Sequence, residues 1–209
     1  MRGARREAPE LTYATPPEWA RRAAREPDAL LSDHAHCELG AAASAQGLVA
    51  RNPSNRLLVE RMIPLAIEEL RHFRQVCAVL RRRGAELAPS YGNPYVEGLQ
   101  RASARDRVDG LLDRLLVAAL IEARSHERFE LLAEHAPPEV AQLYRDLEES
   151  EAAHARLFVD LARRIAPEGE VSERLAHLER LEGELVRGLS FAPRVHSGLA
   201  PQREEAPRG

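Results

Sequence analysis

The sequences ELRH (residues 69–72) and EAAH (residues 151–154) decide the fold of this chain, because each places a Glu and a His on adjacent turns of one helical face. A single Glu precedes each copy, at Glu38 and at Glu122. Four-helix bundles hold two metal ions with this set, one Glu from each of two helices and one Glu-x-x-His from each of the others. The sequence therefore predicts an all-α bundle with six inward-facing metal ligands: Glu38, Glu69, His72, Glu122, Glu151 and His154.

Apolar residues spaced by three and four positions surround each predicted ligand. In one predicted helix, for example, Leu115 and Ala119 precede Glu122, and Phe129 follows it. Such a stripe faces the core of a bundle. Four buried carboxylates would repel one another, and cations would relieve that repulsion. Glu residues that fall off the stripes are interpreted as solvated surface groups: Glu68, Glu127, Glu130 and Glu148.

The composition suits one soluble helical domain. Only 4% of the 209 residues are aromatic, while Ala, Leu, Arg and Glu are abundant, a balance that favours helix over sheet. The net charge is -3, and the chain contains Arg but no Lys. Two cysteines, Cys37 and Cys77, are too few for a disulfide framework, and we find neither a secretory signal nor a membrane-spanning apolar run. We therefore expect a cytoplasmic protein with reduced thiols.

Proline, glycine and capping residues divide the chain into segments. We expect a flexible N-terminus over residues 1–15, a single helical domain over residues 16–190 and an extended tail over residues 191–209. Four long helices are predicted at about residues 28–51, 54–83, 106–135 and 138–165. Pro64 is expected to kink or split the second, and Ser172 to cap a fifth helix. The long connection over residues 85–105 is typical of two antiparallel helix pairs joined by one crossover.

The ligand types narrow the metal but leave the reaction open. Carboxylate-rich sites with one His per metal suit iron or manganese better than zinc. Two such ions can bind dioxygen between them. Three classes of protein therefore fit the residues equally well: a dimetal oxygenase acting on an organic substrate, a ferroxidase or metal-storage protein, and a manganese catalase.

Four longer stretches of sequence are more specific than the ligands alone: LLSDHAHCELGAAASA (residues 30–45), IEELRHFRQVCAVLRRRG (67–84), IEARSHERFELLA (121–133) and SEAAHARLFVDLA (150–162). Together they resemble the MiaE-type tRNA hydroxylases, which belong to the ferritin-like non-haem diiron superfamily. The resemblance extends from TPPEW (residues 15–19) to RVHSGLAP (194–201), so it covers most of the chain.

This resemblance implies a ferritin-like four-helix bundle with one long crossover and extra flanking helices. It also implies an activity, the hydroxylation of the isopentenyl group of a methylthiolated, prenylated adenosine next to the tRNA anticodon. The implied cofactor is a pair of iron ions held by the six residues named above, with dioxygen as co-substrate. Because no flavin or nicotinamide fingerprint is visible, a separate electron-donor reductase is expected as a partner besides tRNA.

Further residues are assigned around this centre. His34 and His126 lie one turn from Glu38 and Glu122, and they are interpreted as hydrogen-bonded core histidines, with an orienting role towards these ligands as the alternative. Cys37, beside Glu38 in sequence, is interpreted as a packing residue. Aromatic candidates for lining an apolar substrate channel, with plain core packing as the alternative, are Phe73, Phe129 and Phe158.

Clustered arginines near the ends of the predicted helices are candidates for contacts with tRNA phosphates. The alternative is that they only compensate the helix dipole at helix C-termini. The predicted set is Arg81, Arg82, Arg83, Arg101 and Arg105. A base that reacts at a buried centre would have to leave its stack to reach it.

Overall fold

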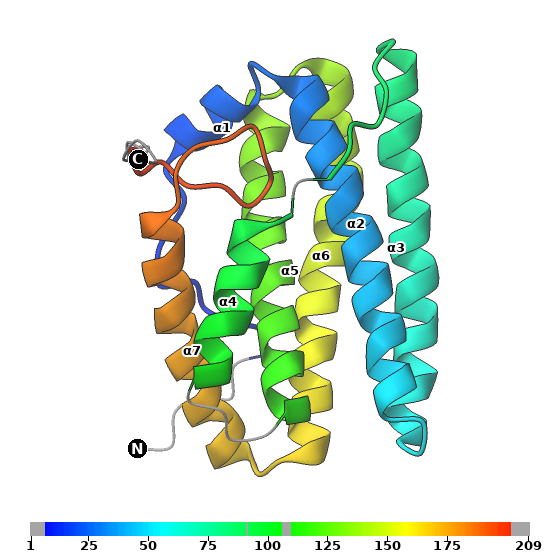
Figure 1. Ribbon diagram of the computed structural model, residues 1–209, viewed down its shortest axis with the longest axis vertical. Helices are drawn as coiled ribbons and strands as arrows, with labels where there is room; N and C mark the ends of the chain where they lie inside the picture. Colours follow the sequence, from blue (N-terminus) through cyan, green and yellow to red (C-terminus); the bar gives the residue numbers. More distant parts are fainter. Residues whose placement is uncertain (1–6, 91, 106–109, 202–209) are drawn as a thin grey trace, which may run out of the picture.

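Seven helices occupy the part of the chain that the computed structural model describes, residues 7–90, 92–105 and 110–201 (Figure 1). Their bounds are α1 Pro17–Ala23, α2 Pro27–Arg51, α3 Arg56–Arg82, α4 Pro94–Arg105, α5 Gly110–His135, α6 Pro138–Ile165 and α7 Glu168–Gly188. In these described residues the only β pairing is an isolated bridge between Ser190 and Ala200. The predicted all-α class is therefore confirmed.

Two antiparallel pairs, α2 with α3 and α5 with α6, form the four-helix bundle (Figure 1). The chain crosses from α3 to α5 through a connection that contains α4, and α4 and α7 pack against each other and against α5. This connectivity is the predicted ferritin-like arrangement with one long crossover and flanking helices. No described helix combines the length and the apolar character needed to cross a bilayer.

The helix ends follow local sequence, with two differences from expectation. The side chain of Asn55 accepts a hydrogen bond from the Leu58 amide and caps α3, which then runs unbroken through Pro64. Pro64 is exposed, so water can satisfy the carbonyl group that its missing N–H leaves unpaired. Ser172 lies inside α7, whose first residue is Glu168. The predicted start at residue 106 lies outside the described residues.

The core consists of two apolar clusters, one towards each end of the bundle. One includes Leu48, Met62 and Leu115, and the other includes Leu31 and Phe129. On every long helix the predicted metal ligand lies between the residues of these two clusters. The apolar stripes therefore continue above and below a polar layer, which is where the site forms.

The segments before α1 and after α7 pack on the bundle. Thr15, Val195 and His196 are buried, and all three contact α5 between residues 124 and 128. The indole of Trp19 donates a hydrogen bond to Ser197. The folded unit is therefore wider than the predicted range of residues 16–190, and residues 191–201 do not form an extended tail. Residues 1–6 and 202–209 lie outside the described part, so the expectations for them stay predictions.

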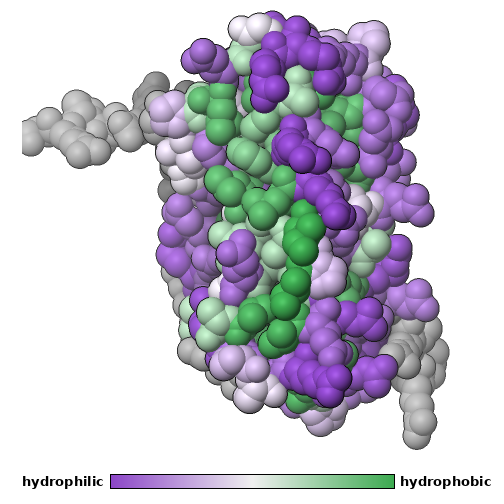
Figure 2. Space-filling view, turned by 90° about the vertical axis from the view of Figure 1, so that its right-hand side faces the viewer, coloured by the Kyte–Doolittle hydropathy of each residue, from purple (hydrophilic) through white to green (hydrophobic). Residues whose placement is uncertain are grey.

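An apolar strip is exposed on the outer face of α2 and α3, which faces the viewer in Figure 2. Part of it is a shallow groove lined by apolar residues that include Val49, Ile63, Ile67 and Leu70. None of the groove's lining residues lines the cavity described below. The strip is therefore separate from the candidate metal centre.

Candidate metal centre

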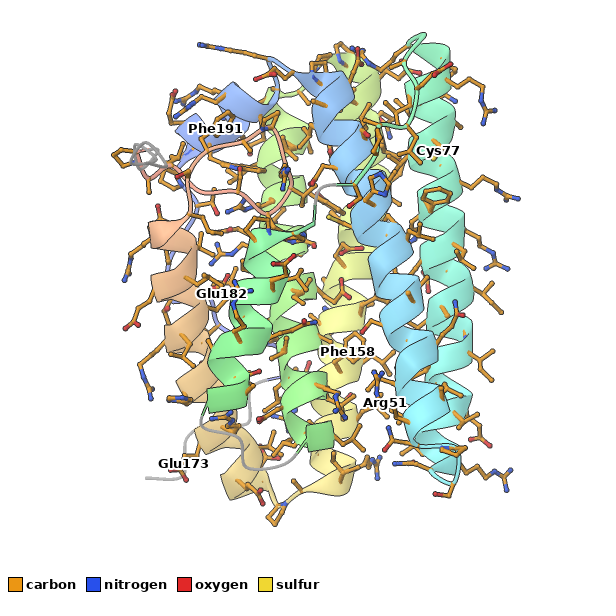
Figure 3. All side chains as sticks on the ribbon, in the orientation of Figure 1. Arg51, Cys77, Phe158, Glu173, Glu182 and Phe191 are labelled. Carbon is orange, nitrogen blue, oxygen red and sulfur yellow. The ribbon has the colours of Figure 1, made fainter. Side chains whose placement is uncertain are left out.

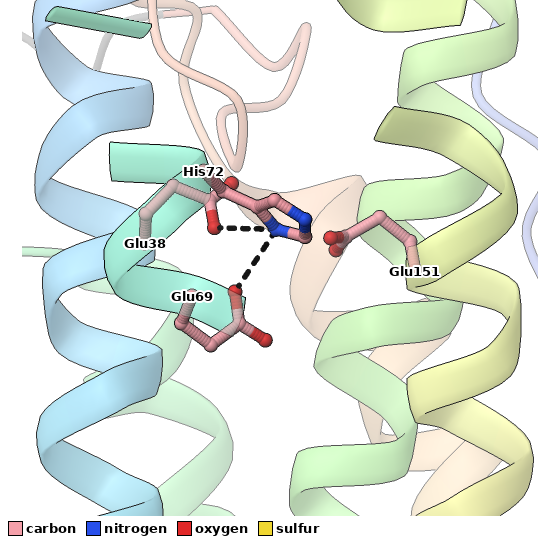
Figure 4. Close-up of side chains that lie close together, drawn as sticks. All are labelled: Glu38, Glu69, His72 and Glu151. Atoms are coloured by element: carbon pink, nitrogen blue, oxygen red, sulfur yellow. Dashed lines mark ion pairs between the residues drawn. The ribbon is translucent and has the colours of Figure 1, made fainter. Parts of the chain in front are cut away.

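All six predicted ligands are buried and converge in the middle of the bundle. Two groups of side chains each present ligand atoms that lie within 4.8 Å of one another. The first group is Glu38, Glu69, His72 and Glu151 (Figure 4), and the second is Glu69, Glu122 and His154. Each group contains one imidazole and carboxylates from more than one helix, so the arrangement offers two adjacent metal positions.

Glu69 belongs to both groups and lies between the two imidazoles. Its Oε1 is 2.9 Å from Nδ1 of His154, and its Oε2 is 3.4 Å from Nδ1 of His72. Nδ1 of His72 is also 3.5 Å from Oε2 of Glu38. Both rings therefore direct Nδ1 towards the carboxylates, and Glu69 would be available as a ligand in both groups.

Unsatisfied polar atoms show that cations fit this cluster. Glu69 Oε1, Glu151 Oε1, and the Nδ1 atoms of His72 and His154 are buried, and among the described residues the close contacts of these atoms lack the geometry of a hydrogen bond. Buried polar atoms without partners are costly, and so is a concentration of buried carboxylates. Iron or manganese ions would accept these donor atoms and offset the negative charge.

Burial and mutual repulsion change the protonation of the metal-free cluster. Burial and the charge of Glu69 raise the pKa of Glu122 to about 8, and burial and the charge of Glu122 raise the pKa of Glu151. Burial alone would lower the pKa of each histidine. Close contacts with the carboxylates of Glu38 and Glu69 outweigh it, raising the pKa of His72 to about 10 and that of His154 to about 9. At neutral pH the metal-free cluster therefore holds several protons.

Metal binding is expected to release these protons, so the apparent affinity for Fe²⁺ or Co²⁺ should rise between about pH 6 and pH 9. The sign follows because the metal binds deprotonated ligands, whereas His154 and Glu122 titrate near 9 and 8 in the metal-free protein. Calorimetric titrations in buffers of different ionisation enthalpy measure the number of protons released. An affinity that is independent of pH, without proton release, would contradict this expectation.

The two histidines considered for orienting ligands differ in position. His34 is fully buried, and its Nε2 lies 2.5 Å from Oε1 of Glu38. Burial alone would raise the pKa of Glu38, but the hydrogen bond and charge of His34 lower it. His126 is partly exposed, and its Nδ1 donates to the backbone carbonyl of Glu148. The geometry thus supports an orienting role for His34, whereas His126 holds α5 to α6.

Glu68 is a residue that the sequence interpretation missed. Its side chain is 45% exposed, as expected for a position off the apolar stripe, yet Oε2 lies 3.3 Å from Nε2 of His154 and Oε1 lies 4.0 Å from Nε2 of His72. One signal was available, because Glu68 precedes His72 by four residues and side chains at that spacing meet on a helix. Its contact with α6 could not be read from the sequence.

A cavity of about 220 Å³ leads to this cluster, with Glu122 in its lining. Apolar and small residues of α2, α4, α5 and α6 form much of its wall, including Ala41, Val96, Ile121 and Phe158. Phe158, labelled in Figure 3, therefore serves as a cavity wall as well as part of the core. Phe129 instead packs against His34, and Phe73 packs against the other apolar cluster. Cys37 also lines the cavity.

The predicted tRNA-contacting arginines lie away from this cavity lining, and three of them are paired. Arg82 contacts Glu139, Arg83 contacts Asp28, and Arg101 contacts Glu97. Arg81 is exposed, and the side chain of Arg105 lies outside the described part of the structure. Two other exposed arginines, Arg51 and Arg114, line a second cavity that shares the wall residues Ser44, Gln100, Ala118 and Ile121 with the first.

Comparisons with known proteins agree with this geometry. Residues 6–197 match the family described as tRNA-(MS[2]IO[6]A)-hydroxylase (MiaE). A Pseudomonas putida protein named tRNA 2-(methylsulfanyl)-N(6)-isopentenyladenosine(37) hydroxylase is 36% identical over 90% of this chain and 92% of its own length. A Salmonella typhimurium protein of the same name is 34% identical over 71% of this chain and 54% of its own length.

A solved structure has the same fold. It is described as Protein 43 with aldehyde deformylating oxygenase activity from Synechococcus, and it superposes with a TM-score of 0.84 at 40% identity, covering 90% of this chain and 96% of that one. The family match spans most of the sequence, all four bundle helices and all six converging residues. The chain therefore belongs to the MiaE family of tRNA hydroxylases.

Proposed function

We propose that this protein is a non-haem diiron monooxygenase that hydroxylates the isopentenyl group of a methylthiolated, prenylated adenosine next to the tRNA anticodon. The observation that carries the proposal is the apolar cavity, which connects the surface with Glu122 beside the other candidate ligands. The name of the Pseudomonas putida relative supports the same substrate. Family membership favours this reaction over metal storage and over a manganese catalase, which the ligand set alone leaves open.

Six side chains would hold the two iron ions: Glu38, Glu69, His72, Glu122, Glu151 and His154. The bound ions would supply the chemistry of dioxygen, which no side chain of the protein can supply. The carboxylates set the charge and spacing of the pair, and His34 keeps the carboxylate of Glu38 oriented. The apolar clusters on both sides of the polar layer exclude water from it.

The cavity determines which part of the substrate reaches the site. A branched five-carbon prenyl group matches a wall formed by Ala41, Val96, Ile121 and Phe158. The polar atoms of the adenine would remain near the mouth, where Asn93 and Ser44 also line the cavity. The base has to leave its stack in the anticodon loop for this geometry.

Two partners are part of the proposal. Arginines at the surface would contact the tRNA phosphates: the exposed Arg51 and Arg114 beside the cavities, together with the exposed Arg81, Arg82 and Arg101 and the partly buried Arg83. The exposed ion pairs of Arg82 and Arg101 contribute little stability, so phosphate can replace their acidic partners. A separate reductase would supply the electrons. A cytoplasmic location follows from the tRNA substrate.

The Ala41→Phe variant tests the cavity. Ala41 is half-buried in the cavity wall, and a phenyl group there would occupy the space needed by the prenyl group. We expect kcat/KM for hydroxylation of prenylated tRNA to fall by about 10–200-fold, the range for a misfit in an apolar pocket. Mass spectrometry of nucleosides from tRNA digested after reaction with reduced protein and oxygen measures the product.

A matched control is Ala43→Phe, because Ala43 is exposed on the same helix and does not line the cavity. This variant should hydroxylate tRNA at the wild-type rate, and both variants should bind metal normally. If wild-type protein loaded with iron forms no hydroxylated nucleoside, the proposed substrate is wrong. Equal activity of Ala41→Phe and wild type would show that the substrate does not use this cavity.

One alternative substrate is favoured by a specific observation. The solved structure at 40% identity is described as having aldehyde deformylating oxygenase activity, and the cavity found here is largely apolar. The same protein preparation can therefore be assayed with an aliphatic aldehyde. Deformylated product without any modified nucleoside would favour this second reaction.

A further inference from the structure

Glu68 occupies a position that relates it to both candidate metal sites. It lies on α3, one turn before His72, and its carboxylate reaches across to α6. Oε2 lies 3.3 Å from Nε2 of His154, and Oε1 lies 4.0 Å from Nε2 of His72. The two oxygen atoms of one carboxylate therefore face imidazoles that belong to the two different ligand groups.

The two imidazole rings have the same orientation with respect to this carboxylate. Their centroids are 6.0 Å apart, and their planes are inclined by 30°. In each ring Nδ1 faces the buried carboxylates and Nε2 faces Glu68. An imidazole that binds a metal through Nδ1 must carry its proton on Nε2, and this N–H requires an acceptor that keeps the tautomer and the ring orientation.

Helix α6, which carries His154, does not place Ser150 as an acceptor for the Nε2–H group of His154. Ser150 lies four residues before His154, in the place equivalent to that of Glu68 before His72. Its hydroxyl donates to the backbone carbonyl of Leu147, 2.7 Å away. A carboxylate from the opposite helix pair, that of Glu68, lies 3.3 Å from Nε2 of His154.

We propose that Glu68 is a positioning residue whose carboxylate forms ion-pair contacts with Nε2 of both His154, at 3.3 Å, and His72, at 4.0 Å, and so orients both imidazoles towards the metal pair. This role couples the two metal positions, because one carboxylate at the surface contacts a histidine ligand of each position. It also ties α3 to α6, the two helices that bring the Glu-x-x-His sequences together across the bundle. The inference uses the proposed metal centre but not the proposed tRNA substrate.

The Glu68→Gln variant tests this role. An amide keeps the size of the side chain but removes its negative charge and turns an NH₂ group towards one of the two imidazoles, so it cannot attract both Nε2–H groups at once. We expect Co²⁺ to bind about 10–100-fold more weakly at both positions, as is typical when the partner of a ligand histidine is lost. The visible absorption spectrum of bound Co²⁺ should also change in this variant. That spectrum reports on the geometry of the ligands independently of activity.

Two controls separate positioning from structural effects. Glu60→Gln alters an exposed carboxylate on the same helix that contacts only Arg56 in the described structure, and it should bind Co²⁺ as wild type does. Glu68→Asp retains a carboxylate and should retain more metal affinity than Glu68→Gln. The metal-free Glu68→Gln protein should unfold close to the wild-type temperature, because the side chain is half-exposed.

The outcomes distinguish this inference from the proposed function. If wild-type protein binds no pair of Co²⁺ ions, the proposed metal centre itself fails. If wild type binds two ions and Glu68→Gln binds them with equal affinity, or loses affinity at one position alone, the shared positioning role is wrong. Parallel weakening at both positions, together with normal stability of the metal-free variant, supports it.

Discussion

The Glu69→Ala variant is expected to lose both metal ions, and hydroxylation with them, while remaining folded. Glu69 is the residue common to the two ligand groups, and its two oxygens face Nδ1 of His72 and Nδ1 of His154. Removing it therefore withdraws one ligand from each ion. Metal content measured by atomic emission should fall from about two ions per chain to well below one.

The stability of this variant provides a second, independent readout. In the metal-free protein Glu69 is a buried carboxylate beside Glu38 and Glu122, and its charge raises the pKa of Glu122. Removing such a group relieves repulsion with Glu122 but also takes a partner from His72 and His154, so metal-free Glu69→Ala should unfold close to the wild-type temperature. Glu130→Gln, which alters an exposed carboxylate on α5, is the control and should keep both ions. Full metal content in Glu69→Ala would exclude the assigned ligand role.

The Glu182→Ala variant is expected to lose about 3–5 kcal/mol of unfolding free energy, the range for an abandoned buried charge. Glu182 on α7 (Figure 3) accepts two hydrogen bonds from the fully buried guanidinium of Arg124, each 2.8 Å long, and one from the hydroxyl of Tyr95. These bonds join α7, α5 and α4 outside the bundle. Without Glu182, the cation and the hydroxyl would lose this buried acceptor.

Thermal denaturation of the metal-free protein measures this loss, which corresponds to a fall in Tm of about 6–20 °C for a chain of this size. The control Glu184→Ala removes an exposed carboxylate two residues later and should change Tm little. A Glu182→Ala variant as stable as wild type would show that Arg124 finds another partner.

Arg124 retains other contacts, and these explain why the N-terminal segment is folded. Its guanidinium also donates to the carbonyl of Tyr13 and the hydroxyl of Thr15, and it pairs with Glu127. Glu127 in turn accepts from the amide and hydroxyl of Thr15. The sequence interpretation placed Glu127 on a solvated face, because it could not show that the segment before α1 covers that face.

The helical periodicity of the apolar residues was sufficient to predict the four-helix bundle and the convergence of the six candidate ligands. Each of these residues interrupts an apolar stripe, and a stripe can face only the core of a four-helix bundle, so Glu38 and Glu151 had to meet near its middle. The same reasoning failed for Glu68. Its helical position is solvent-facing within α3, and only the packing of α6 beside α3 brings it to His154.

The sequence by itself determined the helices, their pairing and the set of six buried side chains. Helical spacing is a local property, and apolar residues at that spacing indicate which face of each helix is buried. Only the tertiary structure decided which oxygen faces which nitrogen, that Glu69 lies in both ligand groups, and that the cavity reaches Glu122. The structure also decided that residues 191–201 pack against the bundle. These features depend on distances between segments far apart in the chain, and no spacing within one helix encodes such a distance.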